Sequence, residues 1–149
     1  MQRTRSRRLL QLGIALFLLG LLTGLAVPAL ANPRMALASH VEAVMNGMFL
    51  VVLGLVWPRL RLSPPLHGAA FWLAVYAGFA NWLATLLAAA WRAGSPMMPL
   101  AAQGSTGSPA QELVLKALLV SLALAMIAAC ALVLFGLRGP AAQADDGQA

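Results

Sequence analysis

A small set of polar side chains interrupts the apolar sequence of this chain, at spacings that a helix would turn into shared faces. They are His40, Glu42 and Asn46 in one apolar run, and Tyr76, Asn81 and Thr85 in the next. A polar or ionisable side chain within a membrane span costs free energy and by default marks a site or a helix contact. An imidazole can bind a metal or haem iron, a carboxyl group can carry a proton, and amides can orient a ligand.

Helical geometry sorts these side chains into faces, because each residue advances the helical wheel by about 100°. Glu42 and Asn46 are one turn apart and share a face, whereas Asn46 lies about 240° around the helix from His40. Asn81 and Thr85 are likewise one turn apart. We therefore expect one helix to present an imidazole on one face and a carboxyl-amide pair on another.

Each of these residues also has a purely structural interpretation. His40 fits a place near the membrane surface, and Glu42 follows Ser39 at the spacing of a capping box, which would only close a helix N-terminus. Asn46 and Asn81 fit the interhelical hydrogen bonds that membrane asparagines commonly make. A helix that begins several residues before Ser39 would place Glu42 well inside it and would disfavour the capping role.

Long apolar stretches must position these side chains, and the composition places them in a bilayer. The chain has 149 residues, of which 61% are hydrophobic and 9% charged, and its mean hydropathy of +0.83 excludes a soluble domain with a polar surface. Several runs approach the roughly 20 residues that span hydrocarbon, so we predict an all-α, integral membrane bundle of four transmembrane helices. The expected helices are about 9–31, 35–57, 66–91 and 111–137, in a single membrane domain at 1–139 that precedes a disordered polar tail at 140–149.

The net charge of +6 comes from basic residues at the ends of the apolar runs, and no basic stripe with interleaved aromatic residues indicates nucleic acid. If the spans alternate, one side of the membrane receives most of these charges, namely Arg3, Arg5, Arg7, Arg8, Arg59, Arg61 and Arg138. The opposite side receives only Arg34, Arg92 and Lys116. The positive-inside rule then places both termini in the cytoplasm.

The first apolar run has two interpretations. A basic N-terminus, an apolar stretch and VPALA before Asn32 resemble a cleaved secretory signal. However, the stretch exceeds the about 7 to 15 residues of a signal h-region, and Gly20 and Gly24 form a GxxxG motif that suits close helix packing. We therefore expect residues 1–31 to stay as a spanning helix, with Asn32 capping the next helix and Pro33 at its first position.

The connections between the apolar runs contain few residues that predict a function. The segment 92–110 contains prolines and glycines without a strand pattern, and it is either a linker outside the membrane or a lid over a pocket. His67 lies in the shorter connection before the third run, where we expect a solvated interfacial residue. The sequence has no P-loop, GxGxxG or Ser/His/Asp arrangement, and its single cysteine, Cys130, excludes a disulfide framework and a cysteine metal cluster.

The order and spacing of the polar residues resemble one known family. HVEAVMNGM at 40–48, then Pro58, then FAN at 79–81 are similar to the bacterial styrene oxide isomerases. Those small four-helix membrane enzymes carry His-x5-Asn-Gly-Met, a proline and Trp-Ala-Asn at the same intervals. The first two runs and the MMP sequence at 97–99 look closer still to hydroxylaminobenzene mutases, which convert arylhydroxylamines to 2-aminophenols by a Bamberger-type rearrangement.

The isomerase resemblance implies a homotrimer in the bacterial inner membrane, with haem b between protomers and its iron held by His40. It also implies that Asn46 lines the open side of the haem and that Asn81 lies near it. The chain departs from the isomerases at Thr85, where they have a catalytic tyrosine, and at Glu42, where they have a small residue. Gaining a carboxyl and losing a phenol indicates a different substrate in the same scaffold.

These observations lead to one mechanistic hypothesis, an arylhydroxylamine mutase in which haem iron acts as a Lewis acid on a small aromatic substrate. Glu42 would transfer a proton, Asn46 and Asn81 would orient the substrate, and Thr85 would leave space or add a weak donor. One alternative is a styrene-oxide-isomerase-like enzyme that converts an epoxide to an aldehyde. Another is a non-catalytic haem-binding or structural membrane subunit, although a single well-placed histidine favours an open iron site over electron transfer.

Overall fold

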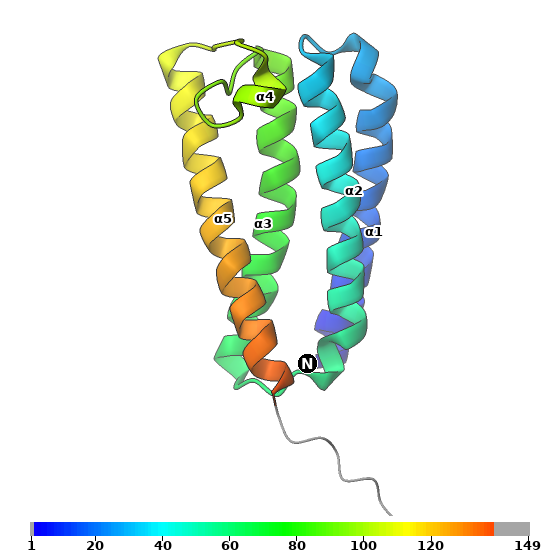
Figure 1. Cartoon of the computed structure of the whole chain (residues 1–149). Coiled ribbons are helices and arrows are strands. Elements are labelled where there is room, and N and C mark those ends of the chain that lie inside the picture. The colour runs from blue at the N-terminus through cyan, green and yellow to red at the C-terminus, as the bar shows by residue number, and fades with distance from the viewer. Residues whose placement is uncertain (1, 139–149) are drawn as a thin grey trace, which may run out of the picture.

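The computed structural model describes residues 2–138, which form long helices joined by short connections (Figure 1). The long helices are α1 (Gln2–Ala26), α2 (Pro33–Val56), α3 (Pro64–Trp91) and α5 (Pro109–Leu137). The short elements are the 3-10 turns η1 (Val27–Ala29) and η2 (Trp57–Arg59) and the single turn α4 (Pro99–Ala102). Within residues 2–138, 4 helices are long and apolar enough to cross a membrane, which confirms the prediction of an all-α fold with four candidate membrane spans. The predicted tail at 140–149 lies outside the described residues.

The first helix begins earlier than predicted. The apolar run starts near residue 9, but α1 already begins at Gln2, within the arginine-rich segment. Arginine is a good helix former, so nothing in this segment stops the helix where hydrocarbon ends. The Ser6 hydroxyl also donates a hydrogen bond to the Gly54 carbonyl at 2.8 Å, which ties this part of α1 to α2. The apolar run therefore defines the span but not the start of the helix.

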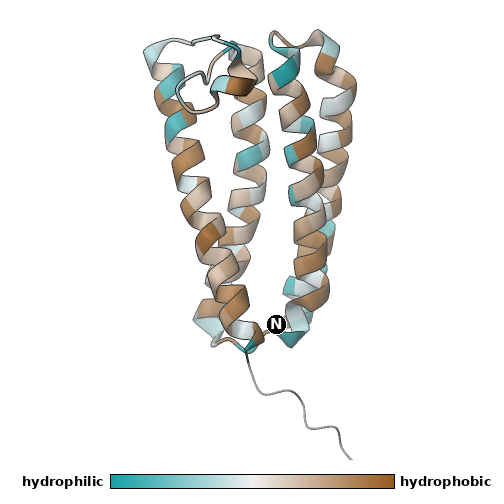
Figure 2. Cartoon of the chain, in the orientation of Figure 1, coloured by the Kyte–Doolittle hydropathy of each residue, from teal (hydrophilic) through white to brown (hydrophobic). Residues whose placement is uncertain are grey.

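The helices stand side by side with α2 between α1 and α3, and with α3 between α2 and α5 (Figure 1). The N-terminus and the end of α5 lie at the same end of the molecule, as an even number of spans requires. Most of each long helix is apolar, and polar segments interrupt it at few positions (Figure 2). Only 11% of the most apolar stretch of α5 is buried, compared with 22% for α1, 33% for α2 and 44% for α3. The apolar side chains of α5 are therefore the most available to lipid or to another chain.

Glycines bring α1 and α2 into close contact. A Cβ added to Gly13 would lie 2.7 Å from the Gly47 carbonyl oxygen, and one added to Gly20 would lie 2.9 Å from the Ala43 Cβ. Such distances show that the two backbones approach as closely as their atoms allow. The packing role predicted for Gly20 is therefore confirmed, and α1 is an integral part of the fold.

The start of α2 follows the predicted capping pattern. The Asn32 side chain accepts a hydrogen bond from the Met35 backbone nitrogen at 3.1 Å, with Pro33 at the first helical position. Its Nδ2 atom donates to the Ala101 carbonyl at 3.3 Å, and its backbone nitrogen donates to the Ala89 carbonyl at 3.0 Å. One residue therefore joins the N-terminus of α2 to the end of α3 and to α4.

The connection 92–110 is a folded cap over this end of the molecule. Arg92 ends α3 in the left-handed conformation at φ 52°, and Gly94 follows at φ 103°. The Oε1 atom of Glu112 accepts hydrogen bonds from the backbone nitrogens of Gly94, at 2.9 Å, and Gly107, at 2.8 Å. Ala102 of α4 is buried in the same apolar cluster as Met35 of α2. Hydrogen bonds at both ends of the connection thus hold it against the helices.

His67 contradicts the prediction of a solvated interfacial residue. Its side chain is 3% exposed, in the first turn of α3, and its ring packs edge-to-face on Trp57 at a centroid distance of 5.3 Å. The Nδ1 atom lies 3.2 Å from the Leu62 carbonyl oxygen. Trp57 at the start of η2 covers the first turn of α3, so the His67 ring is buried although its neighbours Arg61 and Ser63 stay exposed.

Candidate functional site

His40 projects from α2 toward α1, and its orientation is fixed by a hydrogen bond. Its Nδ1 atom lies 2.8 Å from the carbonyl oxygen of Gly20. Because a carbonyl oxygen only accepts, Nδ1 must carry a proton, and in the neutral imidazole this leaves Nε2 with a free lone pair. A histidine that ligates a metal commonly donates its other ring N–H to a carbonyl in this way.

Gly24 provides the space for this imidazole. A Cβ added to Gly24 would lie 2.8 Å from Nδ1 and 3.1 Å from Cε1 of His40. The GxxxG motif therefore has two functions, because Gly20 packs against α2 while Gly24 accommodates a side chain from it. His40 is half-buried and lines an apolar groove of about 450 Å³ together with Leu21, Gly24, Leu25, Val27, Pro28 and Leu37.

These features fit a haem iron better than a bare metal ion. Residues 2–138 contain no group of three or more His, Cys, Asp or Glu side chains that could hold a metal ion. A porphyrin supplies its own equatorial ligands and needs only one axial imidazole from the protein. A tautomer with free Nε2, next to an apolar groove, meets that requirement.

Glu42 and Asn81 meet where α2 packs against α3, and we call the polar residues at this contact, Glu42, Asn46 and Asn81, the polar seam. The Nδ2 atom of Asn81 donates to Oε2 of Glu42 at a distance of 2.6 Å. One turn further along the same seam, Asn46 lies beside Gly78, where an added Cβ would be 3.6 Å from the Asn46 Cβ. The structure thus brings together Glu42, Asn46 and Asn81 and directs His40 to the opposite seam, as the helical wheel predicts.

Asn46 has an unused hydrogen-bond donor. Its side chain is 9% exposed, and its Nδ2 atom has no partner within the described part of the chain. A buried donor without a partner costs roughly 1–3 kcal/mol. Such a cost in a helix seam is typical of a group that bonds to a ligand or to water.

Thr85 lies on the same helix face as Asn81 but directs its hydroxyl elsewhere. Its Oγ1 atom is 2.9 Å from the Asn81 carbonyl and 3.1 Å from the Trp82 carbonyl, both in the preceding turn. The side chain is 4% exposed. Its one proton is therefore used within α3, and the residue differs from a tyrosine chiefly in the space it leaves.

A groove leads to Glu42 from the end of the molecule that α4 covers. It has a volume of about 370 Å³, large enough for a one-ring aromatic molecule. Its lining is apolar except for Glu42 and Arg34, with Leu100 and Ala101 of α4 on one side and Leu37, Ala38 and Val41 on the other. Asn81 is not among the lining residues, and its link to the groove is the hydrogen bond to Glu42.

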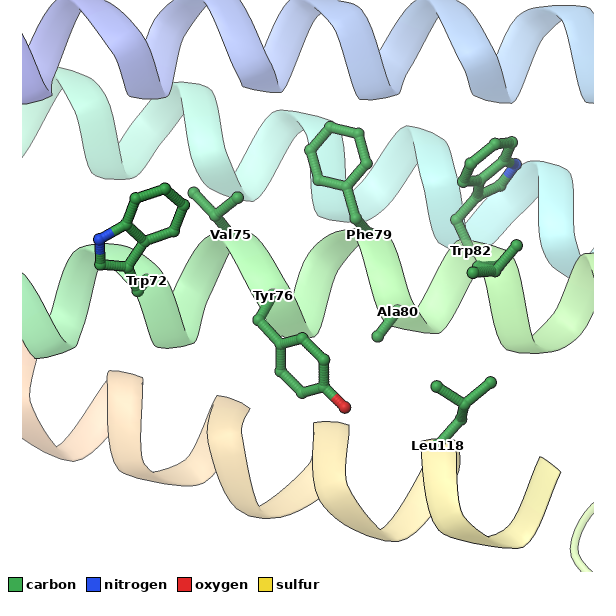
Figure 3. A pocket seen from close by; sticks show the side chains of 8 residues that line it. Trp72, Val75, Tyr76, Phe79, Ala80, Trp82 and Leu118 are labelled. Atoms are coloured by element: carbon green, nitrogen blue, oxygen red, sulfur yellow. The ribbon is translucent and has the colours of Figure 1, made fainter. Parts of the chain in front are cut away.

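A second hollow, of about 440 Å³, lies on α3 and is almost entirely apolar (Figure 3). Its lining residues are Trp72, Val75, Tyr76, Phe79, Ala80, Trp82, Leu83 and Leu118. The Tyr76 hydroxyl points toward α5 in Figure 3 and lies 2.6 Å from Ser121 Oγ. Phe79 and Leu83 are each about 200° around the helix from Asn81, so much of this aromatic pocket faces away from the Asn81 side chain.

Sequence reasoning missed several partners of these residues. Trp82 donates from Nε1 to Thr23 Oγ1 of α1 at 3.0 Å, and Ser39 donates to the Trp82 carbonyl at 3.1 Å. The placement of Trp82 in the middle of a span, away from the interfacial belt, was the only available signal. The partners themselves come from other helices.

The four candidate spans contain a carboxyl (Glu42), two amides (Asn46 and Asn81) and an imidazole (His40). This arrangement defines a multi-pass membrane protein with a polar site inside the spans. A family model described as styrene oxide isomerase matches residues 5–138. The chain belongs to the styrene oxide isomerase family, and the resemblance inferred from its motifs is confirmed.

Two hydroxylaminobenzene mutases are similar to this chain over most of its length. The chain is 59% identical to hydroxylaminobenzene mutase HabB of Ectopseudomonas oleovorans over 145 residues, which are 97% of this chain and 88% of that protein. It is 46% identical to hydroxylaminobenzene mutase HabA of the same organism over 125 residues, which are 84% of this chain and 93% of that protein. No solved structure matches this chain.

Proposed function

We propose that this protein is a membrane mutase that rearranges arylhydroxylamines, such as hydroxylaminobenzene, to 2-aminophenols. The observation that carries the proposal is the 59% identity to HabB, a hydroxylaminobenzene mutase, over 97% of this chain. An aromatic substrate also suits the apolar lining of the groove that reaches Glu42.

The reaction is an isomerisation with no net change in oxidation. The N–O bond breaks, and a C–O bond forms at the ortho carbon. That carbon loses a proton, and the nitrogen gains one. The protein must therefore bind an apolar ring, orient the N–O bond, and move a proton between two nearby atoms of the substrate.

The polar seam supplies groups for these tasks. Glu42 is the carboxyl that would carry the proton, since it lines the groove and is half-buried between α2 and α3. Asn46 and Asn81 would orient the substrate, Asn46 through its unpartnered donor. Thr85 would leave space beside Asn81, because its own hydroxyl proton bonds within α3.

Haem b is the cofactor that we propose on the basis of His40 and its fixed tautomer. The haem iron would supply a Lewis acid that polarises the N–O bond, and a ring of protomers would bring the His40 face of one chain to the Glu42 face of the next. We further propose that the protein is a homotrimer in the bacterial inner membrane, with both termini in the cytoplasm. The basic residues at the end that carries the N-terminus support this orientation.

The first experiment is an absorption spectrum of detergent-purified protein before and after addition of hydroxylaminobenzene, with product analysis. A Soret band that shifts on addition, together with 2-aminophenol, supports both the cofactor and the reaction. His40→Ala should lose the band, and Glu42→Gln should keep the band but lose most turnover. Protein that forms no 2-aminophenol when supplied with ample haem would reject the mutase assignment and favour a structural or haem-binding subunit.

The second candidate function is isomerisation of an epoxide to an aldehyde, which the family model's description favours. Supplying styrene oxide and hydroxylaminobenzene to the same preparation separates the two reactions. A higher kcat/KM for styrene oxide would reverse the order of the candidates.

A further inference from the structure

The hydrogen bond between Asn81 and Glu42 determines which half of the Asn81 amide is free. The two atoms are 2.6 Å apart, and while Glu42 is ionised its Oε2 can only accept. The amide must therefore turn its nitrogen toward Glu42. Its oxygen then points away from Glu42, and within residues 2–138 this Oδ1 atom makes no hydrogen bond.

A free amide oxygen at this place selects for hydrogen-bond donors. An arylhydroxylamine carries N–H and O–H groups, both of which can donate to Oδ1. An epoxide oxygen has lone pairs only, and it would meet an acceptor that it cannot satisfy. Sites that offer a fixed polar partner discriminate strongly against analogues that leave this partner unpaired.

Asn46 supplies the complementary group. Its unpartnered Nδ2 donor lies in the same seam, one helical turn from Glu42. A hydroxylamine oxygen can accept from this donor while the N–H or O–H donates to Asn81. The seam therefore offers one donor and one acceptor, which matches the N–O group of an arylhydroxylamine.

We propose that Glu42, besides its catalytic role, determines substrate class by holding the Asn81 amide with its oxygen toward the substrate. This inference rests on the proposed function, because it explains how a site in this family would accept an arylhydroxylamine in preference to an epoxide. Removing the acceptor at position 42 frees the amide to rotate and to offer its nitrogen instead.

Two unreactive probes test this role by binding alone. N-methylaniline and ethylbenzene are nearly isosteric, and only the first has an N–H donor; neither contains an N–O bond or an epoxide. Their affinities are measured by calorimetry for the wild-type protein and for Glu42→Ala and Glu42→Gln. Comparing the affinity ratio between variants removes the contribution of partition into detergent micelles.

Glutamine is the matched control, because it keeps the length of glutamate and a side-chain oxygen that can accept from Asn81 Nδ2. We expect wild-type protein and Glu42→Gln to bind N-methylaniline about three- to tenfold more tightly than ethylbenzene. Glu42→Ala should lose this preference and should bind acetophenone, a pure acceptor, more tightly than the wild type does. Opposite changes for a donor and an acceptor are not produced by a general loss of structure.

The outcomes separate the inference from the proposed function. A wild-type protein without donor preference, an unchanged ratio in Glu42→Ala, or a ratio lost equally in Glu42→Gln would overturn the inference, even if hydroxylaminobenzene is converted. Absence of turnover in wild-type protein, with the binding pattern as expected, would overturn the mutase proposal and leave the amide assignment supported. If Glu42→Ala is not recovered folded, Glu42→Leu removes the acceptor with a side chain that suits a membrane helix.

Discussion

The Nδ1 atom of His40 on α2 lies 2.8 Å from the carbonyl oxygen of Gly20 on α1, so the first helix orients the imidazole of the second. This contact depends on Gly24, which leaves room for the ring. The first helix would thus be part of the haem site that we propose at His40, through the backbone of Gly20 and the space at Gly24. Changes in α1 should consequently alter the properties of His40.

Gly24→Ala tests this dependence. The added Cβ would lie 2.8 Å from His40 Nδ1, so the ring must move and its hydrogen bond to Gly20 must weaken. We expect haem affinity to fall by about 10- to 100-fold, as for other changes to the partner of a ligating histidine. The Soret absorbance per protein, titrated with haemin, measures the effect. Gly68→Ala is the control, because its Cβ would meet only the Arg5 side chain at 3.5 Å, and an equal effect in both variants would contradict the assignment.

His67→Phe should leave haem content unchanged. The imidazole of His67 is buried against Trp57, and its Nε2 atom has no partner in the described chain. Phenylalanine fills a similar volume without a buried unpaired nitrogen, so stability should stay within about 1 kcal/mol or increase. Spectra and thermal unfolding of His67→Phe and His40→Ala, compared side by side, distinguish the two histidines. Loss of haem in the His67 variant would show that the ligand was assigned to the wrong residue.

Gly47→Ala should destabilise the protein through the α1–α2 contact. The new Cβ would lie 2.7 Å from the Phe17 backbone nitrogen, and backbone atoms cannot move aside cheaply. Overpacking of this kind costs about 1–3 kcal/mol. Unfolding in mixed micelles with increasing denaturing detergent measures the free-energy change. A variant as stable as wild-type protein would mean that α1 and α2 are farther apart than described.

Asn32→Ala removes the cap of α2 and the link to α4 at once, whereas Asn32→Asp keeps the capping oxygen and loses the Nδ2 donor. Loss of an N-cap costs about 1 kcal/mol, so the alanine variant should unfold at a lower temperature. The aspartate variant should show a smaller decrease. If both variants unfold at the same temperature, the cap contributes nothing and the link to α4 accounts for the whole effect.

Glu112→Ala should release the connection 92–110. The carboxylate accepts from the backbone nitrogens of Gly94 and Gly107, and it therefore ties the two ends of the connection together. Hydrogen exchange at both amides should become about tenfold faster for each 1.4 kcal/mol lost. Mass spectrometry of exchanged peptides measures this rate, and Glu112→Gln, which retains an acceptor oxygen, is the control. Parallel turnover assays decide whether the connection acts as a lid, since only a lid would change kcat when it loosens.

The sequence alone determined the number of long helices and the way in which polar residues divide among the faces of α2. Hydropathy reports spans directly, because the bilayer requires about 20 apolar residues in each. The wheel placed His40 apart from Glu42 and Asn46, because helical periodicity depends only on position along the chain. The Asn32–Pro33 cap was predictable for the same reason, since its bonds close within a single turn.

The tertiary structure decided which residues from different helices meet. Both lipid and the protein interior are apolar, so hydropathy does not reveal which side of a membrane helix packs against a neighbour. The pairing of Asn81 with Glu42, the bond from His40 to Gly20 and the burial of His67 against Trp57 therefore carry no signal in local sequence. Close approach at glycines and long-range hydrogen bonds set them, and these arise only when the helices pack.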